Sequence, residues 1–204
     1  MGQPWPFRDF LERKQISLST LSSTISDSMI FFTGDTHFGD SRVLRIDRRP
    51  FPDMATHDVA LIRNWNLIVG IDDEVWHLGD FMSSRAGDCD TLLDRLRGRK
   101  HLIVGNNDSE ATTGASGWSS VQHYKELTLD GCHLVLCHYA FRTWNKMGKG
   151  SVNLHGHSHG RLKPVPRQFD VGVDARELQP VRLDALLAST RRKADARRAK
   201  MNAT

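Results

Sequence analysis

Histidines alternate with small residues in segment 153–160, which reads NLHGHSHG. In an extended strand, alternate residues point to the same side, so this spacing predicts that His155, His157 and His159 share one side. Neutral imidazole is the commonest metal ligand in proteins. The segment therefore predicts a metal site, and a solvated histidine-rich tract is the alternative.

Side chains that bind hard or borderline divalent cations recur along the chain. They are Asp35, His37, Asp80, Asn106, His138, His157 and His159. Seven ligands exceed what one tetrahedral ion takes, and they fit two ions about 3.5–4 Å apart that share a bridging carboxylate. Two such ions suit a phosphate ester, because they neutralise its charge and lower the pKa of a bound water toward about 7.

Short apolar runs precede these side chains and are expected to position them. We expect strands at 30–32, 74–77, 101–104, 152–155 and 169–173, helices at 57–69, 89–96 and 183–200, and a hairpin of 124–129 with 132–137 around Asp130-Gly131. The first half thus has a βαβ pattern and the second half is mostly β. Asp35, Asp80 and Asn106 each follow a strand, where ligand sites of α/β sheets lie.

Five short motifs occur in a fixed order: Asp35-Thr36-His37, Gly79-Asp80, Gly105-Asn106-Asn107-Asp108, His138 and Gly156-His157-Ser158-His159. They resemble the DxH, GD, GNH(D/E), H and GHxH motifs of the calcineurin-like metallophosphoesterase superfamily, in particular its small bacterial-type phosphoesterases. Each motif alone is a weak signal, whereas all five in order, each at a strand end, are a strong one.

The resemblance implies an α/β fold, a four-layer αββα sandwich of two mixed β-sheets flanked by helices. It implies one metal held by Asp35, His37, Asp80 and His159, and a second held by Asp80, Asn106, His138 and His157. The implied activity is that of a metal-dependent phosphoric ester hydrolase, a phosphodiesterase or phosphatase, with a metal-bridging hydroxide as nucleophile beside Asp80. The metal is left open among Mn, Zn, Fe, Ni and Mg, since mixed oxygen and nitrogen ligands accept all of them.

One position departs from the family pattern. The family usually has histidine after the metal-binding asparagine, where it binds phosphate and protonates the leaving group, but this chain has Asn107. An amide can bind a phosphoryl oxygen but supplies no proton at neutral pH. Either the substrate has a good leaving group, or another residue such as His57 supplies the proton, or activity is low. We expect Asp108 to orient the loop or a ligand histidine.

Charge and length suggest three segments. Residues from Arg182 onward carry seven basic and two acidic residues, a net +5, so the rest of this 204-residue chain of net charge +4 carries −1. We expect an N-terminal extension at 1–28 without a catalytic role, a metallophosphoesterase domain at 29–183 and a basic C-terminal helix or tail at 184–204. Three cysteines without a CxxC pair favour a reducing, cytoplasmic location.

A small phosphoester is the expected partner, with no membrane association, and the oligomeric state is open. Two other functions remain. A nuclease could use the basic tail to grip DNA or RNA, although the near-neutral core and low aromatic content disfavour it. A weakly active or non-catalytic binding protein could use the same fold as a scaffold, and Asn107 is its best support.

Overall fold

The structure is a computed structural model and describes residues 28–84 and 86–188. All of the expected N-terminal extension except Ser28, and residues 189–204 of the expected basic tail, lie outside these ranges. Within them, no helix combines the length and hydropathy that a membrane crossing requires.

In the described ranges, nine strands form two sheets. The first has the order β4-β3-β2-β1-β9 and the second β5-β6-β7-β8. The first comprises β1 (Ile30–Thr33), β2 (Glu74–His77), β3 (Arg99–Ile103), β4 (Trp118–Gln122) and β9 (Val181–Arg182). The second comprises β5 (Tyr124–Leu129), β6 (Cys132–Cys137), β7 (Val152–His155) and β8 (Gln168–Asp170). Both are mixed, because β9 runs antiparallel to β1 and β5 antiparallel to β6, while the other neighbours are parallel.

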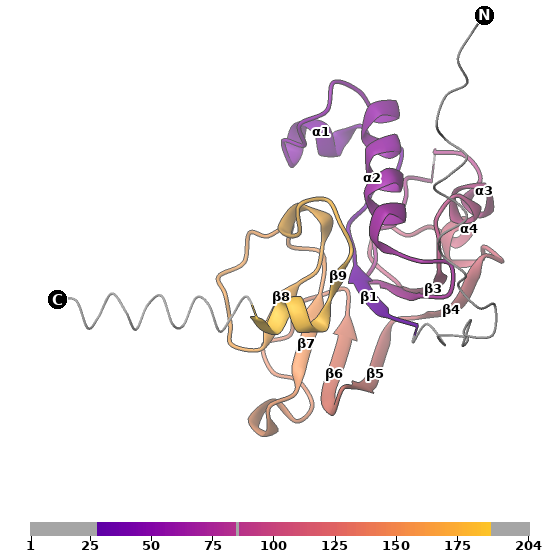
Figure 1. Ribbon diagram of the computed structural model, residues 1–204. Helices are drawn as coiled ribbons and strands as arrows, with labels where there is room; N and C mark the ends of the chain where they lie inside the picture. The colour runs from indigo at the N-terminus through magenta and orange to yellow at the C-terminus, as the bar shows by residue number, and fades with distance from the viewer. Residues whose placement is uncertain (1–27, 85, 189–204) are drawn as a thin grey trace, which may run out of the picture.

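Helices α2 (Met54–Ile68) and α3 (Cys89–Asp94) pack on the outer face of the first sheet (Figure 1). The other described helices are the short α1 (Arg42–Ile46) and α4 (Glu110–Thr113), and single 3₁₀ turns occur at η2 (Met147–Lys149) and η3 (Val173–Ala175). Helix α2 begins at the N-cap Asp53, whose carboxylate accepts a hydrogen bond from the Thr56 backbone N–H. Its buried Leu61 and Trp65 pack with Phe31 and Val75 of the sheet.

A second core lies between the two sheets. Phe32, Trp76 and Leu78 from the first sheet and its strand ends meet Leu136 and Leu154 from the second. Alternate residues of β1 therefore enter different cores: Phe31 faces the helices and Phe32 faces the other sheet. The predicted α/β class with two mixed sheets flanked by helices is confirmed.

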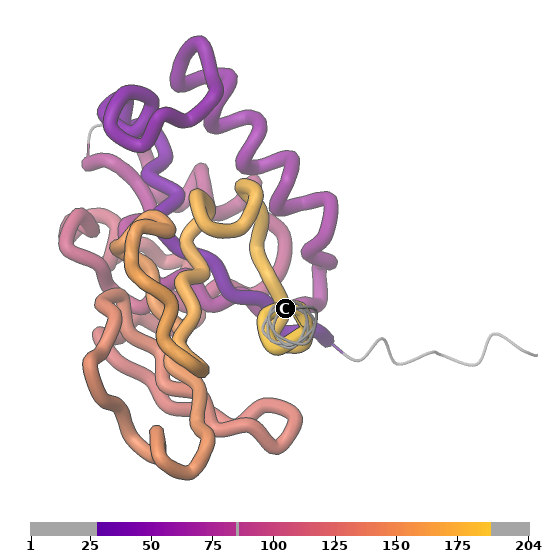
Figure 2. The backbone as a smooth tube through the Cα atoms, turned by 90° about the vertical axis from the view of Figure 1, so that its left-hand side faces the viewer, coloured from indigo at the N-terminus to yellow at the C-terminus, as the bar shows by residue number. Residues whose placement is uncertain are grey.

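The expected elements agree closely with the observed ones where the pattern is strongly apolar. Strands β2, β5, β6 and β7 have the predicted bounds, and Asp130 (φ 51°) and Gly131 (φ 72°) form the predicted hairpin turn. Figure 2 places this hairpin at the opposite end of the molecule from α1 and α2. Helices α1 and α4 and strands β4 and β9 were not predicted. Of the expected terminal helix, residues 183–188 are described and helical, and Leu186 is buried in the core between the sheets.

Candidate metal centre

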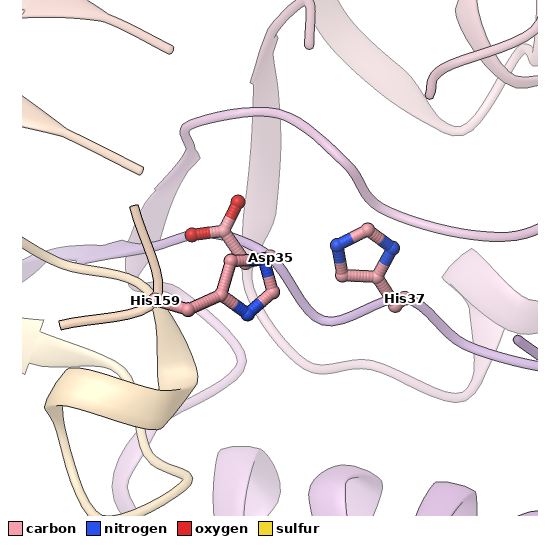
Figure 3. A group of neighbouring side chains, drawn as sticks. All are labelled: Asp35, His37 and His159. Carbon is pink, nitrogen blue, oxygen red and sulfur yellow. The ribbon is translucent and has the colours of Figure 1, made fainter. Parts of the chain in front are cut away.

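The first group of potential metal ligands comprises Asp35, His37 and His159, whose potential ligand atoms all lie within 4.8 Å of one another (Figure 3). Asp35 and His37 follow β1 in one loop, whereas His159 comes from the loop after β7. The rings of His37 and His159 are stacked with centroids 5.3 Å apart. Two segments that are more than a hundred residues apart thus converge at one point.

The second group comprises Asp80, His138 and His157, again with ligand atoms within 4.8 Å. Asp80 follows β2 and His138 follows β6. Asn106, in the loop after β3, joins them: its Oδ1 lies 3.1 Å from His138 Nε2. Each group therefore gathers side chains from the carboxyl ends of neighbouring strands in both sheets, where α/β ligand sites are expected.

Asp80 lies between the two groups. Its Oδ2 is 3.6 Å from His37 Nε2 of the first group, and its Oδ1 is 3.5 Å from His138 Nε2 of the second. One carboxylate can therefore offer one oxygen to each group, which is the arrangement that a shared ligand between two ions requires.

The free atoms of these side chains fit a cation. Asp35 Oδ2 and His37 Nε2 are buried polar atoms without a hydrogen-bond partner, which is costly unless another group satisfies them. His138 and His159 engage Nδ1 with the Leu78 carbonyl (2.7 Å) and the Asp174 carboxylate (2.7 Å). Each histidine thus directs Nε2 toward its group, where His138 Nε2 lies 3.1 Å from Asn106 Oδ1, another potential ligand atom. A hydrogen-bonded outer nitrogen is the pattern of metal-binding histidines.

The electrostatics of the site also favour a cation. Burial raises the pKa of Asp35 well above its ordinary value, so this carboxylate lacks compensating positive charge. Burial lowers the pKa of His37 to about 4, which keeps its imidazole neutral and able to bind a metal. Burial alone would raise the pKa of Asp80. The charge of the nearby His138, two hydrogen bonds from Asn107 and the charge of His37 outweigh burial and lower this pKa.

The backbone at the site differs from the extended conformation expected for the histidine-rich segment. Asp35 (φ 53°) and His37 (φ 50°) are left-handed, as are His157 (φ 64°) and His159 (φ 48°). Strand β7 ends at His155, and the chain then bends because the His157 N–H donates to Asp35 Oδ1 (2.9 Å). The prediction that three histidines share one side of a strand is therefore wrong.

His155 belongs to neither group. It is 3% exposed, and its Nδ1 lies 2.8 Å from the Gly156 carbonyl oxygen. Burial lowers the pKa of His155, so the ring is neutral inside the protein. It is therefore a packed histidine beside the site. This agrees with the ligand sets in the sequence analysis, which include His157 and His159 but not His155.

Asn107 and Asp108 both hold the loop that carries Asp80. Asn107 donates from its side-chain amide to Asp80 Oδ2 (2.7 Å) and from its backbone N–H to Asp80 Oδ1 (2.8 Å). Asp108 Oδ2 accepts from the N–H groups of Asp80 and Gly105, and its Oδ1 accepts from Phe81 N–H. Asp108 thus ties the loop after β2 to the loop after β3.

His57 lies inside the protein and not at the two groups. It is fully buried, with Nδ1 2.8 Å from Asp58 Oδ1 and Nε2 2.8 Å from Arg49 Nη1. A guanidinium only donates, so His57 Nε2 accepts and its single ring proton is on Nδ1, directed at Asp58. This geometry leaves His57 without a proton to offer a substrate, contrary to one of the three possibilities raised by Asn107.

Two residues that the sequence did not single out support the first group. Arg49 is 4% exposed and donates to the backbone carbonyls of Asp35 (2.6 Å) and Thr36 (2.8 Å) and to both carboxylate oxygens of Asp174 (2.9 and 2.8 Å). Asp174 in turn accepts from His159. Asp174 could have been found from the sequence, because it is an acidic residue shortly after a strand, as Asp35 is. Nothing in the sequence distinguishes Arg49 from the other arginines.

Two phage proteins are similar to this chain along most of their length. The gene 66 protein of Mycobacterium phage D29 is 31% identical over 72% of this chain and 89% of its own. The gene 66 protein of Mycobacterium phage L5 is 30% identical over 72% of this chain and 87% of its own. No protein-family model matches the chain.

Among solved structures, the protein of unknown function AQ665 from Aquifex aeolicus aligns with a TM-score of 0.60 at 20% identity, covering 76% of this chain and 95% of its own. Yfce, a phosphoesterase from E. coli, aligns with a TM-score of 0.45 at 14% identity, covering 76% and 81%. The first similarity supports the fold described above.

Proposed function

We propose that the chain is a calcineurin-like metallophosphoesterase and that it acts as a phosphoester hydrolase that depends on two divalent metal ions. The observation that carries the proposal is the pair of groups described above, which meet at Asp80 and contain buried ligand atoms without a partner.

Each proposed metal has its own set of ligands. Asp35, His37, Asp80 and His159 would hold one ion, and Asp80, Asn106, His138 and His157 would hold the other. Bound there, two divalent cations would neutralise the phosphate and lower the pKa of a coordinated water. The mixture of carboxylate, amide and imidazole makes Mn²⁺ and Zn²⁺ the first ions to test.

The chain itself supplies orientation. Asn107 fixes both oxygens of Asp80, and Asp108 fixes the backbone of the same loop. Arg49 donates to the backbone carbonyls of Asp35 and Thr36 and so holds the loop after β1. These contacts set the ligand directions before a substrate arrives, so that little reorganisation is needed during the reaction.

The site is open on one side. Asp35, His37, Asp80 and His138 are buried, whereas Asn106, Asn107 and His157 are exposed. A phosphoester would therefore approach the second group, over Asn106 and His157. An exposed approach without a covering domain in the described ranges suits a small or accessible phosphoester, either a monoester or a diester.

Hydrolysis of bis(para-nitrophenyl) phosphate with added Mn²⁺ tests the proposal. Asp80→Ala removes the shared ligand and His138→Ala removes a ligand of the second group, so each should abolish turnover. His123→Ala, which changes an exposed histidine outside both groups, should leave turnover unchanged. Equal rates for wild type, Asp80→Ala and His138→Ala would refute the assignment.

A further inference from the structure

The hydroxyl group of Tyr139 lies at the open side of the proposed metal centre. Tyr139 directly follows His138 and is 46% exposed. Its ring packs edge to face on the rings of His157 (centroids 4.7 Å apart) and His138 (5.0 Å). These two contacts fix the direction of the phenol, so its hydroxyl stays beside the second group of ligands.

The Tyr139 hydroxyl donates only a long, weak hydrogen bond. It reaches Asn106 Oδ1 at 3.3 Å, beyond the roughly 2.5–3.0 Å of an ordinary O–H···O hydrogen bond. The same Asn106 oxygen also contacts His138 Nε2 at 3.1 Å. A negatively charged phosphoryl or leaving oxygen is a stronger acceptor than an amide, so it would compete successfully for this proton.

The other polar groups at this side are committed or lack a suitable proton. Asn107 donates hydrogen bonds from its side-chain amide and its backbone N–H to Asp80. His157 is a proposed ligand of the second ion, and its ring packs against those of His138 and Tyr139. His57, as described above, directs its proton to Asp58. A phenol, by contrast, carries an O–H that can be both shared and transferred.

We propose that Tyr139 touches the substrate and protonates its leaving group, in the place where this chain has no histidine. This inference rests on the proposed function. A water oxygen forms the new bond to phosphorus. As the bond between phosphorus and the leaving oxygen breaks, the leaving oxygen takes the electron pair and then the phenolic proton. The tyrosinate regains a proton from solvent water, so Tyr139 is unchanged after each turnover.

The proposal predicts a dependence on the leaving group. Nitrophenolate is a stable anion and needs no proton, whereas phenolate and alkoxides are more basic. With methyl aryl phosphates, Tyr139→Phe should lower the kcat/KM for para-nitrophenyl release least, because this leaving group needs no proton. It should lower the kcat/KM for unsubstituted phenyl release by about 10²-fold, the lower end of what a general acid contributes.

A second measurement does not depend on turnover. Inorganic phosphate, titrated calorimetrically into the Mn²⁺-loaded protein, offers an oxygen in the leaving position. Loss of one hydrogen bond to a charged oxygen should weaken its binding about tenfold in Tyr139→Phe. The number of Mn²⁺ ions bound per chain should stay as in wild type, because Phe keeps the ring contacts to both histidines.

The chain provides a matched control. It has two tyrosines, and Tyr124 is similarly exposed (44%) but lies on β5 and donates to Glu126. Tyr124→Phe should change neither the leaving-group dependence nor phosphate binding.

Three results would overturn the role of Tyr139. The first is an equal leaving-group dependence in wild type and Tyr139→Phe, which would leave the hydrolase function intact. The second is loss of Mn²⁺ from Tyr139→Phe, which would mean that the residue acts through Asn106. The third is unchanged phosphate binding by Tyr139→Phe, which would refute the contact between Tyr139 and the substrate. If wild type hydrolyses no ester, the proposed function itself fails.

Discussion

At the scale of single residues, the candidate ligands are held in unusual backbone conformations. Asp35, His37, Asp80, His157 and His159 all have positive φ, although none is glycine. Such residues cost on the order of 1–3 kcal/mol each and persist where the surroundings determine them. Here the surroundings are hydrogen bonds from Arg49, Asn107 and the His157 backbone. The strain therefore falls on the residues proposed to bind metal.

Asp174 provides the first prediction at this scale. It accepts the Nδ1 proton of His159. Burial alone would raise the pKa of Asp174, but hydrogen bonds from His159 and Arg49 outweigh burial and hold that pKa below its ordinary value. Asp174→Asn removes the charge that orients His159. We expect Mn²⁺ affinity, measured by calorimetry, to fall by about 10–100-fold.

The control for this prediction is Asp184→Asn, which changes an exposed carboxylate paired with Arg182. It should bind Mn²⁺ as wild type does. Far-UV circular dichroism of Asp174→Asn should match wild type, because the amide still accepts a hydrogen bond. Unchanged Mn²⁺ affinity in a folded Asp174→Asn would show that His159 needs no such partner.

The candidate metal ligands can be found from the sequence more easily than the residues that hold them in place. Each candidate ligand has a chemically distinctive side chain and follows an apolar run, so pattern alone finds it. Arg49 is an arginine among several in the segment RIDRRP and acts through backbone carbonyls. Its role depends on a contact with Asp174 that spans 125 residues, and no local pattern encodes such a contact.

At the scale of elements, loops after strands of both sheets must pack very closely. A Cβ atom on Gly79 would lie 2.4 Å from His138 Nδ1 and 2.7 Å from the Gly105 backbone. Gly79 also has φ +87°, where side chains are disfavoured. The glycines at these strand ends thus allow carboxylates and imidazoles from different loops to meet.

Gly172 gives a prediction at this scale. Its backbone (φ −57°, ψ 147°) suits alanine, but a Cβ there would lie 2.3 Å from Asp35 Oδ2. Gly172→Ala should therefore displace the Asp35 carboxylate with little backbone strain. We expect Mn²⁺ affinity to fall by about 10–100-fold, the loss typical when a ligand's support is disturbed.

Gly148→Ala is the matched control, since a Cβ there meets no atom within 4 Å. It should bind Mn²⁺ normally. If Gly172→Ala and Gly148→Ala bind Mn²⁺ equally well, Asp35 is not a ligand in the proposed position.

Elements with strong apolar patterns were predicted and irregular ones were not. β2 and β6 bury consecutive apolar residues, so their bounds follow from the sequence. β4, with the sequence WSSVQ, is half polar, and β9 has two residues. The left-handed turns at the ligands were missed for a different reason: they are imposed by hydrogen bonds between loops, such as the one from His157 N–H to Asp35.

At the scale of the whole molecule, a buried neutral histidine makes stability depend on pH. Burial lowers the pKa of His77 to about 3, against about 6.5 in an unfolded chain. The unfolded state therefore binds a proton that the folded state rejects as the pH falls below about 6.5. Stability is greatest above that pH and is lost progressively toward about pH 3.

His77 can be tested with a variant that does not titrate. Thr36 Oγ1 donates to the Phe81 carbonyl (2.7 Å) and lies 2.9 Å from His77 Nε2, so His77 is the donor in that contact. Gln in place of His77 can keep this donor. Between about pH 8 and about pH 5, wild type should lose about 2 kcal/mol more than His77→Gln, measured by urea unfolding with a chelator present. Parallel losses in the two proteins would contradict this account.

The central claim is that two cations are held on either side of Asp80. Anomalous scattering from crystals soaked in Mn²⁺ tests it most directly, because it locates each ion. We predict two peaks, one among Asp35, His37, Asp80 and His159 and the other among Asp80, Asn106, His138 and His157, about 3.5–4 Å apart. A single peak, or peaks away from Asp80, would contradict the claim.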